Sequence, residues 1–350
     1  MQSGCAPGAL SAANAWAVKT RPTKNSRQVA GLLAAAMLAW LPCVHPAIAG
    51  QMPAAERAAA QTADDRSVPQ PKGAPDTPPG SATARPLAEP SPVLPRGRVY
   101  LFRGAMGLIF SRGMDKLTAN IQRAGVTANV YEFTVCDLVT AAAIEKYRQD
   151  PAPLILIGHS MGGRCALQFS EKLRDEGIPV SLVVTIDPAQ LSPDVPLNVE
   201  RFINIFLSTD VLGGGDIKPT QGFQGHYASY DLAQRDEVSH ITIDKMNSIH
   251  LELIAKIVQL AATPAMDHGG TFPLRYVVPP KTEIELWDSG VTVAAHSGDT
   301  LQTLAGQYHL PLWSLTQVNP MPKNAPLAAG QHIIVPRHLT APTEPISSRH

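Results

Sequence analysis

Residues 152–177 have the sequence APLILIGHSMGGRCALQFSEKLRDEG, and this stretch decides the fold. Its first part, residues 152–160, is an apolar run of the kind found in a central parallel strand that is covered on both faces. Its second part, residues 162–177, has apolar side chains at helical spacing and ends at Gly177. The stretch therefore predicts a buried strand, a tight turn and an amphipathic helix.

The alternation of strand and helix continues on both sides of this stretch. Apolar runs predict strands at 98–104, 127–133, 152–160, 180–187 and 201–208. Helical spacing predicts helices at 114–125, 138–149, 162–177 and 245–260. Such alternation is typical of βαβ units and a parallel sheet. We therefore expect an α/β fold over residues 97–262, with a five-stranded sheet and no room for a large lid domain.

The turn between the strand and the helix carries the nucleophile pattern G-x-S-x-G, with Gly158, Ser160 and Gly162 at the fixed positions. In this pattern the serine lies on a strained turn that exposes its hydroxyl above the sheet edge. The helix that follows favours negative charge near its first turn. The alternative is a chance glycine-rich turn, but the motif lies in register between strand and helix. The sequence thus predicts Ser160 as a nucleophile.

A serine hydroxyl is a weak nucleophile and needs a base beside it. Where the G-x-S-x-G turn occurs, the other partners follow in the order acid and then histidine. His240 lies in a polar loop just before the last predicted helix, and we favour it as the base. His226, in the preceding loop, and His250, inside the helix, remain alternatives. His159, next to the nucleophile, is expected to pack.

The acid has to hold the imidazole in one orientation. Asp187 ends one predicted strand and is followed by Pro188, whereas Asp210 follows the next strand. We favour Asp187, since an abrupt Asp-Pro strand end aims a carboxylate rigidly, and keep Asp210 as the alternative acid.

An oxyanion hole needs two backbone N–H groups. One belongs to the residue after the nucleophile, Met161, and the other to the loop after the first strand, where Ala105 or Met106 is the candidate. Arg103, beside this loop, has either a structural role or a contact with an anionic group of the substrate.

At these residues the sequence resembles the α/β-hydrolase superfamily over about residues 97–262. The segment TIDPA (185–189) resembles the strand end that carries the acid in pancreatic-type lipases, and the resemblance supports Asp187. The RGA loop is similar to the oxyanion loop of those lipases, but Arg103 replaces their histidine. The resemblance implies hydrolysis of an ester, a thioester or an amide without choosing among them.

The C-terminal segments VTVAAHSGDTLQTLAGQYHLPLWSLTQVNP (291–320) and LAAGQHIIVP (327–336) are similar to a LysM module. The resemblance implies a βααβ fold over residues 291–337 that binds glycans containing N-acetylglucosamine, such as peptidoglycan. It places the groove between two loops, with the candidate residues Gly298, Asp299, Thr300, Leu301, Ala325, Pro326 and Leu327. The alternative is a module kept only as a spacer.

The remaining segments are expected to lie outside these two domains. Basic residues followed by an apolar run predict a signal peptide at residues 1–49, although an uncleaved membrane anchor is an alternative. Residues 50–96 are rich in Pro and Ala and predict a disordered linker. A further linker is expected at 263–290 and a disordered tail at 338–350. Export to the periplasm or cell envelope follows from the leader.

The composition also bears on the partners, cysteines and cofactors of the protein. The chain has 29 basic and 29 acidic residues, and this balance does not favour nucleic acid as a partner. Outside the leader the cysteines are Cys136 and Cys165; in an exported protein they could pair, but we expect two buried thiols. No metal-binding cluster or nucleotide-binding motif is visible, so neither a metal nor a cofactor is expected.

Three functions follow as hypotheses. The first is an exported serine hydrolase that cleaves a carboxylic ester and is held at the cell wall by the LysM module. The second is a thioesterase or amidase with the same triad. The third is a non-catalytic peptidoglycan-binding protein, against which the intact Ser160 motif argues.

Overall fold

The computed structural model describes residues 96–105, 107–262 and 271–338. The expected leader at 1–49, nearly all of the expected linker at 50–96 and the tail from residue 339 lie outside the described residues. Within the described part, none of the helices is both long and apolar enough to span a bilayer.

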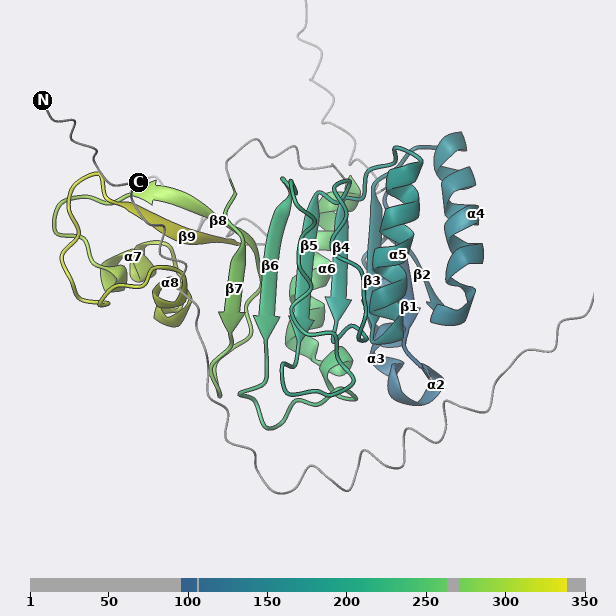
Figure 1. Cartoon of the computed structure of the whole chain (residues 1–350), viewed down its shortest axis with the longest axis horizontal. Helices are drawn as coiled ribbons and strands as arrows, with labels where there is room; N and C mark the ends of the chain where they lie inside the picture. The colour runs from purple at the N-terminus through teal and green to yellow at the C-terminus, as the bar shows by residue number, and fades with distance from the viewer. Residues whose placement is uncertain (1–95, 106, 263–270, 339–350) are drawn as a thin grey trace, which may run out of the picture. The chain divides into compact units, whose positions relative to one another are not determined.

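A seven-stranded parallel sheet, in the order β2-β1-β3-β4-β5-β6-β7, forms the centre of the fold (Figure 1). Each neighbouring pair is parallel, so all carboxyl ends of the strands meet at one edge. The strands are β1 (Arg98–Arg103), β2 (Thr127–Glu132), β3 (Leu154–His159), β4 (Leu182–Ile186), β5 (Arg201–Phe206), β6 (His226–Asp231) and β7 (Leu274–Val277).

The sheet has two more strands than the five expected from the sequence. β6 places His226 and Ser229 at buried positions, and these polar side chains break the apolar pattern that marks a buried strand. β7 is only four residues long and lies in the segment expected to be a linker. Neither strand therefore gives a clear periodic signal.

Helices cover both faces of the sheet. In β1, Val99 and Leu101 point into the cluster that includes α3 and α6, whereas Tyr100 and Phe102 point into the cluster that includes α4 and α5. Figure 1 shows α5 in front of the strands and α6 behind them. The helices of this domain are α2 (Gly107–Phe110), α3 (Arg112–Arg123), α4 (Cys136–Gln149), α5 (Met161–Asp175) and α6 (Asn247–Ala262). Short 3-10 turns lie at Phe133–Val135 and Ile243–Lys245.

A disulfide joins Cys136, the first residue of α4, to Cys165 in α5. The expectation of two free buried thiols was therefore wrong. The two cysteines are 29 residues apart in sequence, and only the packing of the two helices on one face of the sheet brings them together.

The C-terminal region forms a small antiparallel sheet with two helices, as expected for a LysM module. β8 pairs with β9 antiparallel. The side chain of Thr300 caps the first helix by accepting the Thr303 N–H. The elements are β8 (Trp287–Ala294), α7 (Leu301–Gln307), α8 (Leu312–Val318) and β9 (His332–His338).

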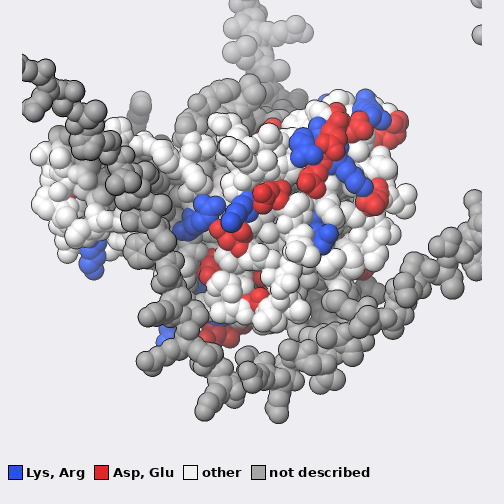
Figure 2. Space-filling model, in the orientation of Figure 1, with Lys and Arg blue, Asp and Glu red and all other residues white. Residues whose placement is uncertain are grey.

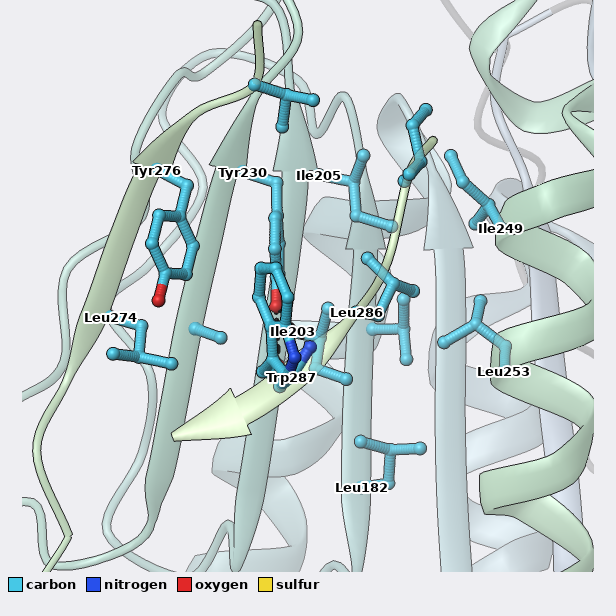
Figure 3. Close-up of a cluster of buried hydrophobic side chains, with 14 of the residues drawn as sticks. Leu182, Ile203, Ile205, Tyr230, Ile249, Leu253, Leu274, Tyr276, Leu286 and Trp287 are labelled. Carbon is cyan, nitrogen blue, oxygen red and sulfur yellow. Dashed lines mark hydrogen bonds between the residues drawn. The ribbon is translucent and has the colours of Figure 1, made fainter. Parts of the chain in front are cut away.

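The module packs against the last strands of the large sheet through aromatic side chains. Trp287 is fully buried, and its ring centroid lies 5.2 Å from that of Tyr276 (Figure 3). The ring centroid of Trp313 in α8 lies 5.6 Å from that of Trp287. The side chain of Gln317 donates to the carbonyl of Val277 and accepts its N–H, so α8 pairs with the backbone of the last residue of β7. The segment expected to be a linker thus contributes to a shared core.

A buried ion cluster reinforces this junction. Asp288 of β8 lies 3.1 Å from Arg337 of β9 and 3.6 Å from both Arg201 of β5 and Lys256 of α6. On the face shown in Figure 2, basic and acidic side chains are intermingled. Ion pairs also join α4 to α5 and to the residue after it, in the pairs Lys172–Asp137 and Arg148–Glu176.

Candidate active site

Ser160 lies on the sharp turn between β3 and α5. Its backbone has φ 55° and ψ −122°, a region that residues with a side chain seldom adopt. A Cβ on Gly158 would clash with the backbone of Gly162, and a Cβ on Gly162 would clash with the carbonyl of Phe102. The two glycines therefore allow the turn to form, and the turn puts Ser160 at the carboxyl edge of the sheet, at the start of a helix.

The structure brings His240 together with both candidate acids. Nδ1 of His240 donates a hydrogen bond to Oδ2 of Asp187 at 2.7 Å, and Oδ2 of Asp210 lies 2.8 Å from the same nitrogen. Asp187 is fully buried, and its other oxygen accepts the N–H of Leu207 at 3.2 Å. The second oxygen of Asp210 accepts the N–H of Leu212 at 3.0 Å. Both carboxylates are thus held in place by backbone groups.

The two carboxylates control the charge of the imidazole. Burial of His240 opposes its charged form, but the contacts with Asp187 and Asp210 outweigh burial and raise the pKa of His240 to about 9. Burial raises the pKa of Asp187 to about 6, against the lowering effect of His240. Burial also acts on Asp210, but His240, Asp187 and the Leu212 N–H together bring its pKa well below the usual range. The three groups titrate as one coupled system.

Ser160 and His240 are not hydrogen-bonded to each other within the described part of the chain. Nδ1 of His240 is the ring nitrogen that contacts the two acids, and Nε2 makes no hydrogen bond to any described residue. The ring of His240 lies 4.8 Å, centroid to centroid, from that of His159, the residue before Ser160. Catalytic hydrogen bonds are often long in the absence of substrate.

His159 links three loops of the site by hydrogen bonds, a role that the sequence did not reveal. Its Nε2 lies 2.9 Å from the carbonyl oxygen of His240, which can only accept, so Nε2 carries the proton. Its Nδ1 then accepts from the Ser111 hydroxyl at 2.7 Å, and Ser111 Oγ in turn accepts the Gly104 N–H at 3.0 Å. Burial and the nearby His240 lower the pKa of His159 to about 3, so the ring stays neutral.

The loop after β1 lies directly against the nucleophile. A Cβ on Gly104 would lie 2.7 Å from Cβ of Ser160, so this loop approaches the turn as closely as backbone allows. Within the described residues, the N–H groups of Met161 and Ala105 donate to no other group. Among the described residues, neither candidate oxyanion N–H therefore has an acceptor, and both belong to segments that border Ser160. Met106 lies outside the described residues.

Arg103 has a structural role. Its guanidinium pairs with Asp115 of α3 and with Glu132 of β2, the latter at 3.0 Å. Because the guanidinium already pairs with two carboxylates, the alternative contact with an anionic substrate group is not favoured.

The other histidines lie away from this arrangement. His226 begins β6, so it lies at the amino edge of the sheet, where its Nδ1 lies 2.9 Å from the hydroxyl of Ser289. His250 is buried in α6, and its Nε2 donates to the carbonyl of Asp244 at 2.7 Å.

Asp187, Asp210 and His240 also meet the spacing that a metal ion would need, because their ligand atoms lie within 4.8 Å of one another. In the described arrangement Nδ1 of His240 donates to Asp187, so it would have to lose this proton before it could bind a metal.

The expected glycan-binding loops of the module lie next to each other. The Gly298 N–H donates to the Leu327 carbonyl at 3.1 Å, and the Leu327 N–H donates to the Asp299 carbonyl at 2.7 Å. The side chains of Leu301 and Leu327 are buried in the core, so these two residues could reach a ligand only through backbone groups. The candidates with accessible surface are Gly298, Asp299, Thr300, Ala325 and Pro326.

Comparisons with known proteins agree with this architecture. Residues 134–200 match the family model of the thioesterase domain, and residues 296–336 match that of the LysM domain. No curated protein matches the chain. The chain accordingly has a thioesterase-type α/β-hydrolase domain and a C-terminal LysM module.

Solved structures similar to the chain include three hydrolases. One is the RedJ thioesterase of the prodiginine pathway in Streptomyces coelicolor, with 19% identity, a TM-score of 0.21 and 31% of this chain covered; the match spans about half of that protein, 46%. A putative α/β-superfamily hydrolase from Xanthomonas campestris has 16% identity and a TM-score of 0.30, covering 47% of this chain and 98% of the other. Human thioesterase 2 has 13% identity and a TM-score of 0.32, covering 48% and 98%.

Proposed function

We propose that the chain is an exported serine hydrolase that cleaves an acyl ester or thioester through a covalent intermediate on Ser160. The observation that carries this proposal is the hydrogen bond from Nδ1 of His240 to Asp187 at the sheet edge where the elbow presents Ser160. A base oriented by a buried acid, beside a nucleophile on a strained turn, is the arrangement that acyl transfer requires.

Acylation begins with the neutral imidazole of His240. Its Nε2 takes the proton of the Ser160 hydroxyl while Oγ attacks the carbonyl carbon of the substrate. The carbonyl oxygen becomes an oxyanion, which accepts hydrogen bonds from the N–H groups of Met161 and Ala105. His240 then gives its proton to the departing alcohol or thiol, which leaves the acyl group on Ser160.

Deacylation repeats the sequence with water as the nucleophile. Nε2 of His240 takes a proton from the water, the hydroxide adds to the acyl carbon, and Ser160 Oγ leaves with the proton returned by His240. Throughout both steps Asp187 holds the ring in one orientation and stabilises its charged form. The nearby Asp210 adds a second negative charge to the same side of the ring.

The thioesterase family match favours a thioester within this substrate class. The disulfide between Cys136 and Cys165 supports export, because such bonds persist in oxidising compartments such as the bacterial periplasm. The LysM module would hold the enzyme at a glycan of the cell wall and so raise its local concentration there.

A fluorophosphonate probe tests the catalytic part. We expect the wild-type protein to be labelled and Ser160→Ala to remain unlabelled, while Ser297→Ala, an exposed serine in the module, is labelled like the wild type. Folded wild-type protein that resists the probe would contradict a serine hydrolase and would favour a binding protein. A panel of matched esters, thioesters and anilides then identifies the bond that is cleaved.

Sedimentation with purified peptidoglycan tests the binding part separately. We expect the full chain to sediment with the polymer and to be released by soluble oligomers of N-acetylglucosamine. A protein that stays in the supernatant at low salt would leave the module with a structural role only.

A further inference from the structure

The carboxyl edge of the sheet carries a set of exposed aliphatic side chains. Within the described residues, five of the exposed large apolar residues lie no more than five positions from Gly104, Asp187, Asp210 or His240. We call this set the apolar rim; it consists of Ile109, Leu191, Val211, Leu212 and Ile241. They are five of the eleven exposed large apolar residues in the described part of the chain, and exposed apolar residues that gather at one place can mark a ligand-binding surface.

Hydrogen bonds place two segments of the rim beside the nucleophile. The Ala189 N–H donates to the carbonyl of Ser160 at 3.0 Å, which holds the start of the loop after β4 against the elbow. The next residue, Gln190, donates its backbone N–H to the Leu212 carbonyl at 3.3 Å and its side-chain amide to the Val211 carbonyl at 2.5 Å. Leu191 and Leu212 therefore belong to two paired loops that border Ser160.

Leu191 is also held in an uncommon conformation. Within the described part of the chain, five residues other than glycine have positive φ, and three of them are Ser160, Asp187 and Leu191. A branched side chain at φ 61° is disfavoured, and this one is 85% exposed, so it gains little from burial in the free protein. A conformation that is costly for both backbone and side chain is a feature found at ligand-binding positions.

We propose that the apolar rim binds the acyl chain of the substrate, so that the enzyme is selective for aliphatic chains of medium or greater length. This inference rests on the proposed function, because it takes Ser160 as the point to which the chain is attached. Leu191 and Val211 are 85% and 71% exposed, so the chain lies on an open surface rather than in a closed tunnel. The rate should therefore rise with chain length and then level off, without a sharp upper limit.

The chemistry of the neighbouring residues agrees with an uncharged chain. Arg103, the cation beside the oxyanion loop, is committed to Asp115 and Glu132. Next to His240, the Asp187 and Asp210 carboxylates would repel an acyl group that ends in a carboxylate. Burial of a methylene contributes to the binding energy in proportion to the area removed from water.

Hydrolysis of 4-nitrophenyl esters with acyl chains of two to eight carbons, kept below their micellar concentrations, tests the proposal. We expect kcat/KM to be at least about tenfold higher for the octanoate than for the acetate. The double variant Leu191→Ser, Leu212→Ser should reduce this ratio by about threefold or more. Leu138→Ser, an equally apolar and 72% exposed position on α4, should keep the wild-type ratio. Thermal melting of each variant checks that it is folded.

Two results separate failure of this inference from failure of the proposed function. If the acetate is hydrolysed as well as the octanoate, or if the double variant keeps the wild-type ratio, the rim does not bind the acyl chain, although Ser160 is still a nucleophile. If no ester or thioester of any length is hydrolysed and the fluorophosphonate probe fails, the proposed function is itself contradicted.

Discussion

Oδ2 of Asp210 lies 2.8 Å from Nδ1 of His240, an imidazole nitrogen that already donates a hydrogen bond to Asp187. The two acids follow neighbouring strands, β4 and β5, and each is anchored by a backbone N–H. A base flanked by two carboxylates binds its proton more tightly than a base flanked by one. Under the proposed mechanism, this relationship sets the pH range in which His240 can act as the base.

The first prediction concerns the pH profile. Only the neutral imidazole can accept the Ser160 proton, and the pKa of His240 is raised to about 9, so kcat/KM should increase with pH up to about that value. Asp210→Asn removes one negative charge and lowers the pKa of His240. The pH at which kcat/KM stops rising should therefore fall by about one unit. Ester hydrolysis measured from pH 6 to 10 checks both. If kcat/KM of the wild type rises with a midpoint near pH 6.5, and the midpoint is the same in Asp210→Asn, the prediction is contradicted.

The second prediction separates the two acids. Nδ1 of His240 donates its hydrogen bond to Asp187, which is the fully buried one of the two. Asp187→Asn should therefore lower kcat by about 10²- to 10⁴-fold, because the ring loses its orientation. Asp210→Asn should cost less than about tenfold at the pH optimum of each protein, since Asp187 remains. Equal losses in both variants would show that the acids share the role.

The third prediction concerns His159. Its hydrogen bonds fix the Ser111 hydroxyl, the Gly104 loop and the backbone of His240, so His159→Gln and Ser111→Ala should each lower kcat by about tenfold with little change in KM. Assays well below the melting temperature exclude unfolding as the cause. Variants that lose stability but keep the wild-type kcat would show that the network only supports the fold.

The fourth prediction concerns stability. The disulfide between Cys136 and Cys165 closes a loop over a separation of 29 residues, and removing it should lower the free energy of unfolding by about 2–4 kcal/mol. Urea unfolding of the wild type with and without reductant measures this difference, with Cys136→Ser, Cys165→Ser as the control that reductant should not affect. A loss below about 0.5 kcal/mol would mean that packing alone joins α4 to α5.

The β3–turn–α5 unit could be predicted because all its determinants are contiguous in sequence. The apolar strand, the two glycines around Ser160 and the amphipathic helix occupy 26 successive residues, 152–177. The same holds for the LysM module, whose turn and cap residues lie close together around Thr300. Strands β6 and β7 gave no such local signal, because their residues are buried by contacts with distant parts of the chain.

The arrangement of side chains within the site was less predictable. The sequence named Asp187 and Asp210 as alternatives, since nothing local shows that the ends of two strands converge on one nitrogen. The hydrogen-bond partners of His159 lie 48 and 81 residues away in sequence. Nothing close to His159 in the sequence therefore showed that it joins several loops by hydrogen bonds, and it was expected only to pack. The pairing of Cys136 with Cys165 likewise depends on tertiary packing.

The most direct test of the central claim is the mass of the intact protein quenched within seconds of mixing with excess 4-nitrophenyl octanoate. We predict a transient increase equal to one octanoyl group, located by peptide mapping on the fragment that contains Ser160 and missing from Ser160→Ala. Hydrolysis that proceeds without an adduct and at the same rate in Ser160→Ala would contradict the account.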